Sequence, residues 1–216
     1  MRWFDVSSDL VDFAITTFDV SPERLASLLP PEMEPERVTL DDGRERALVS
    51  AVTFVNTRFF VGYAPFVKLR CAQTNYRAYV RRGEESGCHF FATHLDHLLV
   101  VMPRYGWQMP WTRSRVKCET KWKSEKLERY DWEGIGGEGI ERLRARGRDE
   151  PTGTLSGFAD AASTARLLTA PLLGWLKRRD GKLATYSVWH APLEMERCDV
   201  EEARFECWER LGLVER

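Results

Sequence analysis

The chain has 216 residues, of which 43% are hydrophobic and 30% charged, so it is long enough for a sizeable core and unlike a disordered chain in composition. Its 32 basic and 33 acidic residues give a formal net charge of −1, which removes any overall attraction to nucleic acid or to an anionic membrane and leaves room only for a local basic patch. We therefore expect one domain over residues 1–216, with no nucleic-acid or membrane partner. A homo-oligomer of this domain is compatible with the sequence.

The N-terminus and the cysteines indicate a cytoplasmic protein. The first twenty residues carry acids among their apolar side chains, so they lack the uninterrupted apolar core of a signal peptide. The five cysteines are an odd number, are widely spaced and form no C-x-x-C pair. We expect reduced thiols and no cofactor or structural metal.

The first half of the chain predicts one short helix followed by strands. Residues 21–29 (SPERLASLL) have the Ser-Pro start of a helix, which Pro30 and Pro31 end. Residues 46–62 and 71–82 read as strands, as does 88–95, whereas 95–102 (LDHLLVVM) could be strand or short helix. Residues 114–126 alternate, which places Lys117, Lys121 and Lys123 on a solvent face.

The second half is less regular. Residues 134–153 combine glycines, charges and a proline, and we expect a mobile excursion there. Helical spacing follows over residues 155–165, a strand signal over 182–198, and an amphipathic helix or strand over 201–213. Several strands with few helices predict an α+β fold, an antiparallel barrel or sandwich with a few flanking helices.

Two sets of polar residues are candidates for chemistry. His89, His94 and His97 lie near Asp96, but on a strand His94 and His97 face opposite ways, which disfavours a metal site. No serine-hydrolase elbow or phosphate loop is present in the sequence.

The second set lies on the strand 71–82, where Asn75, Arg77 and Tyr79 share one face. Alternation alone favours solvent for this polar face and the core for Tyr76 and Val80. If the polar face instead points into a barrel, Arg77 becomes a buried cation that needs an anionic partner.

Several segments in order resemble domain of unknown function family 2071, within the acetoacetate decarboxylase-like superfamily. SPERLASLLPPEM is similar to the family's V-P-x-x-L-x-x-L-L-P, and NYRAYV to its N-x-R-x-Y-V, with Asn75, Arg77 and Tyr79 at the matching positions. HFFATHLD, YGWQMPW, GTLSGFAD and GKLATYSVWHAPLEM resemble later family segments, and His190 stands at the family's histidine position.

This resemblance implies a predominantly antiparallel β-barrel with an interior pocket, and it favours the pocket reading of Arg77. In acetoacetate decarboxylase a Gly-Phe-Pro motif precedes a Lys-Lys pair, one of which forms a Schiff base. Here Trp111 and Thr112 follow Pro110, so that amine is missing from the sequence.

We therefore expect a barrel that binds a small organic carboxylate without Schiff-base chemistry. Arg77 would hold the carboxylate, Asn75 and Tyr79 would orient it, and Tyr105 and Trp111 would form aromatic walls. A competing hypothesis is a lyase or isomerase of oxo or hydroxy acids that uses His94 or His190 as acid or base. A third is a non-catalytic interaction protein.

Overall fold

The computed structural model describes residues 6–61, 69–151, 153–169, 173–187, 193 and 195–215. Its strands are β1 (Val6–Val20), β2 (Glu34–Pro35), β3 (Arg37–Thr39), β4 (Glu45–Val61), β5 (Leu69–Arg82), β6 (Glu85–Leu95), β7 (Trp111–Lys123), β8 (Lys126–Gly136), β9 (Gly139–Pro151), β10 (Leu173–Lys177), β11 (Leu183–Ser187) and β12 (Glu196–Phe205). The helices are α1 (Pro22–Ala26), η1 (Leu98–Val100), η2 (Met102–Gly106), α2 (Ala161–Thr169) and α3 (Glu206–Arg210).

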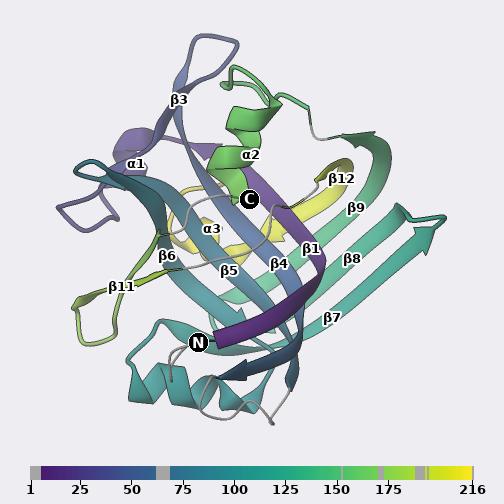
Figure 1. Cartoon of the computed structure of the whole chain (residues 1–216). Coiled ribbons are helices and arrows are strands. Elements are labelled where there is room, and N and C mark those ends of the chain that lie inside the picture. The colour runs from purple at the N-terminus through teal and green to yellow at the C-terminus, as the bar shows by residue number, and fades with distance from the viewer. Residues whose placement is uncertain are drawn as a thin grey trace.

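The strands form one curled sheet with the order β1-β4-β5-β6-β7-β8-β9-β12, a half-barrel with few helices (Figure 1). The expected barrel needs two corrections. The sheet is mixed, because β6 runs parallel to both β7 and β10. It is also open, because among the described residues no pairing joins β1 to β12, although the rings of Phe18 and Phe205 on these two edges lie 6.2 Å apart.

The early elements follow their sequence signals. Ser21 caps α1 by accepting a hydrogen bond from the Arg24 amide at 3.1 Å, with Pro22 as the first helical residue. The predicted strands at 46–62 and 71–82 are β4 and β5, which pair antiparallel over most of their length. The ambiguous run after β6 forms the short helices η1 and η2.

Residues 134–153, where we expect a mobile excursion, contain the end of β8 and the whole of β9, and their mobility stays a prediction. The glycines allow close packing inside the sheet. A Cβ on Gly134 would lie 2.6 Å from a carboxylate oxygen of Glu141, and one on Gly136 would lie 2.4 Å from the carbonyl oxygen of Arg113. Gly139, with φ +119°, starts β9 after the tight turn.

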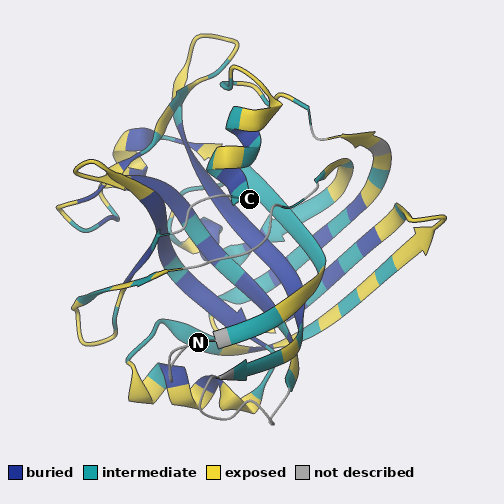
Figure 2. Ribbon diagram, in the orientation of Figure 1, coloured by how far each residue is buried: buried dark blue, intermediate teal, exposed yellow. Residues whose placement is uncertain are grey.

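Both faces of β5 are covered. One face, with Tyr76, Ala78 and Val80, belongs to the main core together with side chains of β8, β9, β12 and α3. The other face, with Tyr79, packs against Leu168 of α2 and Leu176 of β10 in a second apolar cluster. Figure 2 shows the central strands as the most buried part of the molecule. No described helix is long and apolar enough to cross a membrane.

We expect Gly87→Ala to lower the free energy of unfolding by about 1–3 kcal/mol, because its new methyl group would overlap a packed ring. The added Cβ would lie 2.5 Å from the ring of buried Trp175 and 2.7 Å from the carbonyl oxygen of Leu173. Gly106→Ala is the control, since no atom lies within 4 Å of its added Cβ. Urea denaturation of both variants measures the difference, and equal stabilities would contradict the packing argument.

Candidate functional site

Arg77 projects from β5 into the space beneath α2. Its Nη2 donates to the hydroxyl of Tyr79 at 3.3 Å and to the carbonyl oxygen of Leu168, near the C-terminal end of α2. The guanidinium also lies over the Tyr79 ring, 5.4 Å from its centroid. Its Nε is buried and has no hydrogen-bond partner. Arg77 is therefore held in place with part of its donor set unused.

The neighbours of Arg77 do not neutralise its charge. Burial raises the pKa of Tyr79 and of Cys88, although Arg77 opposes both shifts, so these side chains remain uncharged at neutral pH. Burial also raises the pKa of Tyr186 well above its ordinary value. Among the described residues, no carboxylate is in an ion pair with Arg77. The site is a partly buried cation lacking a counter-anion within that part of the chain.

A chain of hydroxyl groups leads away from Arg77. The Tyr79 hydroxyl is 2.9 Å from that of Ser50, which is 2.8 Å from that of Thr17. The chain crosses from β5 through β4 to the edge strand β1, and two of its members, Tyr79 and Ser50, are buried. These groups fix the Tyr79 ring on which the guanidinium rests.

Of the other residues predicted for the pocket, Asn75 and Trp111 lie beside Thr93 but Tyr105 does not. Asn75 accepts hydrogen bonds from Gln73 at 2.8 Å and from Thr93 at 3.1 Å. Trp111 pairs with Thr93 across β6 and β7. Tyr105 is 57% exposed on η2 and carries Arg104 and Arg179 against its ring.

The opposite face of β5 carries a separate polar cluster around Glu141 of β9. This carboxylate is 1% exposed and accepts hydrogen bonds from Thr74 at 2.6 Å, Tyr76 at 3.0 Å and the Trp132 indole at 3.0 Å. The fourth donor is Nδ1 of His94, which is equally buried. Burial would raise the pKa of Glu141, but the hydrogen bonds from His94, Thr74 and Trp132 outweigh burial and lower it.

His94 uses both ring nitrogens within this cluster. Nδ1 faces Glu141, and Nε2 lies 3.3 Å from the backbone N–H of Glu138, from which it accepts. This pair of contacts fits the neutral ring with its proton on Nδ1. The geometry suits a structural role for His94, since no nitrogen is left to exchange a proton with a bound molecule.

Our sequence reasoning missed Glu141, although a signal was present. In β9, Leu143 and Ala145 are buried and alternate with Arg142 and Arg144, which are partly exposed, and Glu141 is in phase with the apolar pair. A carboxylate in the buried phase of a strand predicts a satisfied polar cluster. The neighbouring glycines made the segment look irregular and hid this alternation.

The remaining histidines lie apart. His89 is buried against Phe91, and burial, then the charge of Lys177, lower its pKa to about 4. His97 caps η1 by accepting from the Leu99 amide at 3.1 Å. His190 lies outside the described residues. The described part of the chain holds no group of three or more His, Cys, Asp or Glu placed to bind a metal ion.

Every lysine that the structure describes is exposed. Lys117 lies 2.9 Å from Glu119, and this hydrogen bond, with the charge of Glu119, raises the pKa of Lys117. Its amine therefore stays protonated at neutral pH and is a poor nucleophile. Trp111 and Thr112 begin β7, and Lys68 lies outside the described residues.

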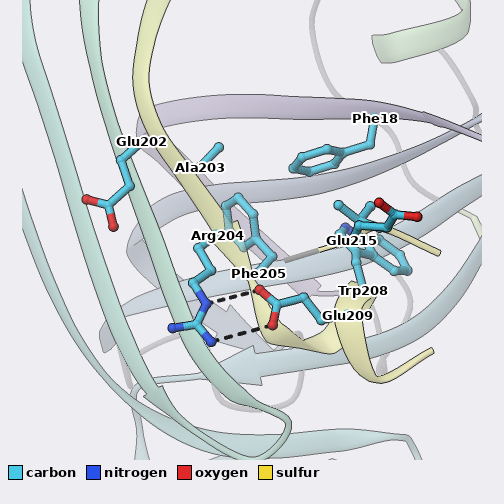
Figure 3. Close-up of a pocket in the computed structure, with 9 residues that line it drawn as sticks. Phe18, Glu202, Ala203, Arg204, Phe205, Trp208, Glu209 and Glu215 are labelled. Atoms are coloured by element: carbon cyan, nitrogen blue, oxygen red, sulfur yellow. Dashed lines mark hydrogen bonds and ion pairs between the residues drawn. The ribbon is translucent and has the colours of Figure 1, made fainter. Parts of the chain in front are cut away.

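A surface pocket of about 420 Å³ lies where β1 and β12 approach each other, next to α3 (Figure 3). Phe18, Phe205 and Trp208 form its apolar walls, and Glu202, Glu209 and Glu215 supply acidic side chains. Arg204, the one cation among the described residues that line it, is paired with Glu206 at 2.7 Å and with Glu209 at 3.0 Å. Of the residues predicted for the site, none that the structure describes lines this pocket.

Comparison with solved structures identifies the fold as that of acetoacetate decarboxylase. The crystal structure of acetoacetate decarboxylase from Legionella pneumophila matches with a TM-score of 0.55 and 15% identity, over 94% of this chain and 76% of that one. A second acetoacetate decarboxylase structure matches with a TM-score of 0.51 and 10% identity, over 93% of this chain and 75% of the other. At these identities the likeness defines the class of fold alone.

The family follows from the sequence. The profile of DUF2071, described as an uncharacterized conserved protein, matches residues 8–216, so the chain belongs to this family. No curated protein matches the chain.

We expect Glu141→Gln to lower the free energy of unfolding by about 1.5–3 kcal/mol, because the amide replaces one acceptor oxygen with a donor facing other donors. Glu133→Gln is the matched control on neighbouring β8, since Glu133 is only partly buried and pairs with Arg144 at 3.2 Å near the surface. That change should cost about 1 kcal/mol or less. Urea denaturation at pH 7 measures both free energies of unfolding. Equal losses in the two variants would show that the buried hydrogen bonds of Glu141 stabilise the fold no more than the surface pairs of Glu133 do.

The variants Glu141→Gln and Glu133→Gln should also differ in how their free energy of unfolding depends on pH. The folded-state pKa of Glu141 is lowered, so its stabilisation is complete above the unfolded pKa of about 4.3 and is lost as the pH falls through the folded value. We expect the acid-side fall in unfolding free energy to be shallower in Glu141→Gln than in the wild type or Glu133→Gln. Denaturation series across the acid range measure these slopes.

Proposed function

We propose that this protein binds a small organic carboxylate at Arg77. The observation that carries the proposal is the partly buried guanidinium, whose buried Nε has no hydrogen-bond partner and whose charge no described carboxylate balances. A buried unpaired cation costs several kcal/mol, which a bound anion would offset. The guanidinium fork matches a carboxylate in shape and charge.

The surroundings of Arg77 favour a small, partly apolar acid. Phe90, Leu168, Leu176 and Tyr79 belong to the apolar cluster on this face of β5. The unused Nε supplies a directed donor, and the Tyr79 hydroxyl lies beside Nη2. Asn75 is two residues away on the same face and would orient the far end of the ligand, with Trp111 beyond it. Two neighbours in fold are themselves called acetoacetate decarboxylases, proteins named for an oxo acid.

The proposed binding does not use a Schiff base. The described lysines are all exposed, and Lys117 is held protonated by Glu119. Trp111 and Thr112 stand at the start of β7, where the resemblance places the decarboxylase's amines. We infer that the ligand is held by charge and hydrogen bonds.

The alternative of an acid–base lyase or isomerase has less support from the geometry. His94 is 1% exposed, bonded at both nitrogens, and on the opposite face of the sheet from Arg77. The hypothesis that His190 supplies the proton stays a prediction, because this residue lies outside the described part of the chain.

Arg77→Gln should weaken the binding of small carboxylates by at least about tenfold, because it removes a charge-assisted hydrogen bond. Native mass spectrometry and thermal shift with pyruvate, acetoacetate, lactate and short fatty acids measure this, since a ligand of the folded state raises the melting temperature. Arg77→Met is the second variant, because its apolar chain can occupy the buried space if the glutamine variant fails to fold.

Arg46→Gln is the matched control for this experiment. Arg46 lies on neighbouring β4, is 26% exposed, and is already paired with Asp19 at 2.7 Å. Acid binding should survive this change. If both Arg77 variants fold and keep the wild-type affinity for every acid that the wild type retains, Arg77 does not hold the carboxylate.

Borohydride treatment in the presence of acetoacetate or pyruvate should give no covalent adduct, because the described amines are all exposed to solvent and Lys117 is held protonated by Glu119. Intact-mass measurement detects the reduced adduct, and Lys117→Ala and Lys68→Ala identify its position if one forms. An adduct at either lysine would contradict binding without a Schiff base while leaving the role of Arg77 to be tested separately.

A further inference from the structure

The segment of residues 98–107, here called the apolar protrusion, concentrates exposed large hydrophobic side chains in ten consecutive residues. Six of the eleven exposed large hydrophobic residues in that part of the chain lie within it, with exposures from 41% to 63%. They are Leu98, Leu99, Val101, Met102, Tyr105 and Trp107. Exposed apolar side chains gathered in one place mark an interaction surface.

The apolar protrusion is built to hold these side chains outward. His97 caps η1, and the buried side chains of Val100 and Pro103 anchor the segment from below. The Met109 amide donates to the Pro103 carbonyl at 3.0 Å, which closes the loop on itself. This helical segment stands out at the lower edge of the molecule in Figure 1, and residues coloured as exposed make up much of it in Figure 2.

Cations border the apolar protrusion on the side of the turn between β10 and β11. Arg179 donates its backbone N–H to the Gln108 carbonyl at 2.7 Å, and its guanidinium lies over the Tyr105 ring at 5.0 Å. Arg104 lies over the same ring at 5.8 Å. The turn also carries Lys177, Arg178 and Lys182, against Asp180, which is paired with Arg178 at 2.8 Å. The sequence holds no acid from residue 97 to residue 118.

We propose that the apolar protrusion and its flanking cations dock this protein on the surface of an anionic lipid bilayer. Leucine, methionine and valine would enter the boundary between headgroups and acyl chains, with the tyrosine and tryptophan rings at headgroup level. The neighbouring arginines would contact the anionic headgroups. A net charge near zero does not oppose this, because attraction to a surface depends on the charges within a Debye length of it.

Charge and shape favour a bilayer over a second copy of the chain or an acidic peptide. A twofold contact through the apolar protrusion would bring Arg104 and Arg179 of both copies together without acids to pair them. A peptide helix binds in an apolar groove, whereas the exposed side chains of the apolar protrusion project outward from the short helices η1 and η2. A lipid surface accepts a projecting apolar segment without a complementary groove.

Co-sedimentation of the full chain with vesicles tests the proposal. We expect binding to phosphatidylserine–phosphatidylcholine vesicles, little binding to pure phosphatidylcholine, and loss of binding at high salt. Met102→Ser/Trp107→Ser should weaken binding by more than about tenfold, because it removes two inserted side chains. Arg179→Glu should weaken it by at least about fivefold, from the attraction of one cation to the anionic surface.

Ile135→Ser and Arg44→Glu are the matched controls, since both side chains are exposed elsewhere on the molecule and their loss should leave binding unchanged. Circular dichroism melting confirms that each variant is folded. Three results would overturn the proposal. The first is no vesicle binding, and the second is equal binding to neutral and anionic vesicles. The third is a concentration-dependent dimer, seen by sedimentation velocity, that is absent in the Met102→Ser/Trp107→Ser variant.

Discussion

The buried carboxylate of Glu141 is the interaction around which the two halves of the sheet are assembled. Its four donors come from β5, β6 and β8, while Glu141 itself belongs to β9. A carboxylate this deep is tolerated only when its lone pairs are satisfied, so the strands that supply the donors must keep one arrangement. The cluster therefore specifies how the early and late strands face each other, and thereby where the other face of β5 presents Arg77.

Glu141 and Arg77, on opposite faces of the sheet around β5, are charged side chains whose charges are balanced in different ways. Glu141 is balanced within the protein, by donors that leave it nothing further to bind. Arg77 is only partly balanced, by a carbonyl oxygen near the C-terminal end of α2 and by one tyrosine hydroxyl. A satisfied buried charge points to structure and an unsatisfied one points to recognition, and this contrast separates the two faces of one strand.

Much of the local structure could be predicted from the sequence, because it depends on near neighbours along the chain. The Ser-Pro start of α1, the long apolar strands β4 and β5, and the alternation of β7 with its exposed lysines are of this kind. Alternation could not show that both faces of β5 are covered, since the cover on one side comes from α2, about ninety residues later. Nor could alternation show that Trp122, which is in phase with the partly buried Val116 and Cys118, is 55% exposed because β7 ends in a hairpin beyond the core.

Among the described strands the open sheet leaves β12 at an edge, with one row of its backbone groups not paired to a neighbouring strand of that part of the chain. Such an edge invites a strand of another molecule to add to it, which is how many β proteins aggregate. Charged residues make up most of β12 (ERCDVEEARF), and several of its acids are paired to arginines of β9. A strand approaching this edge would have to bring its side chains beside those charges and strip water from them. The half-barrel can therefore stay open without becoming a template for fibrils.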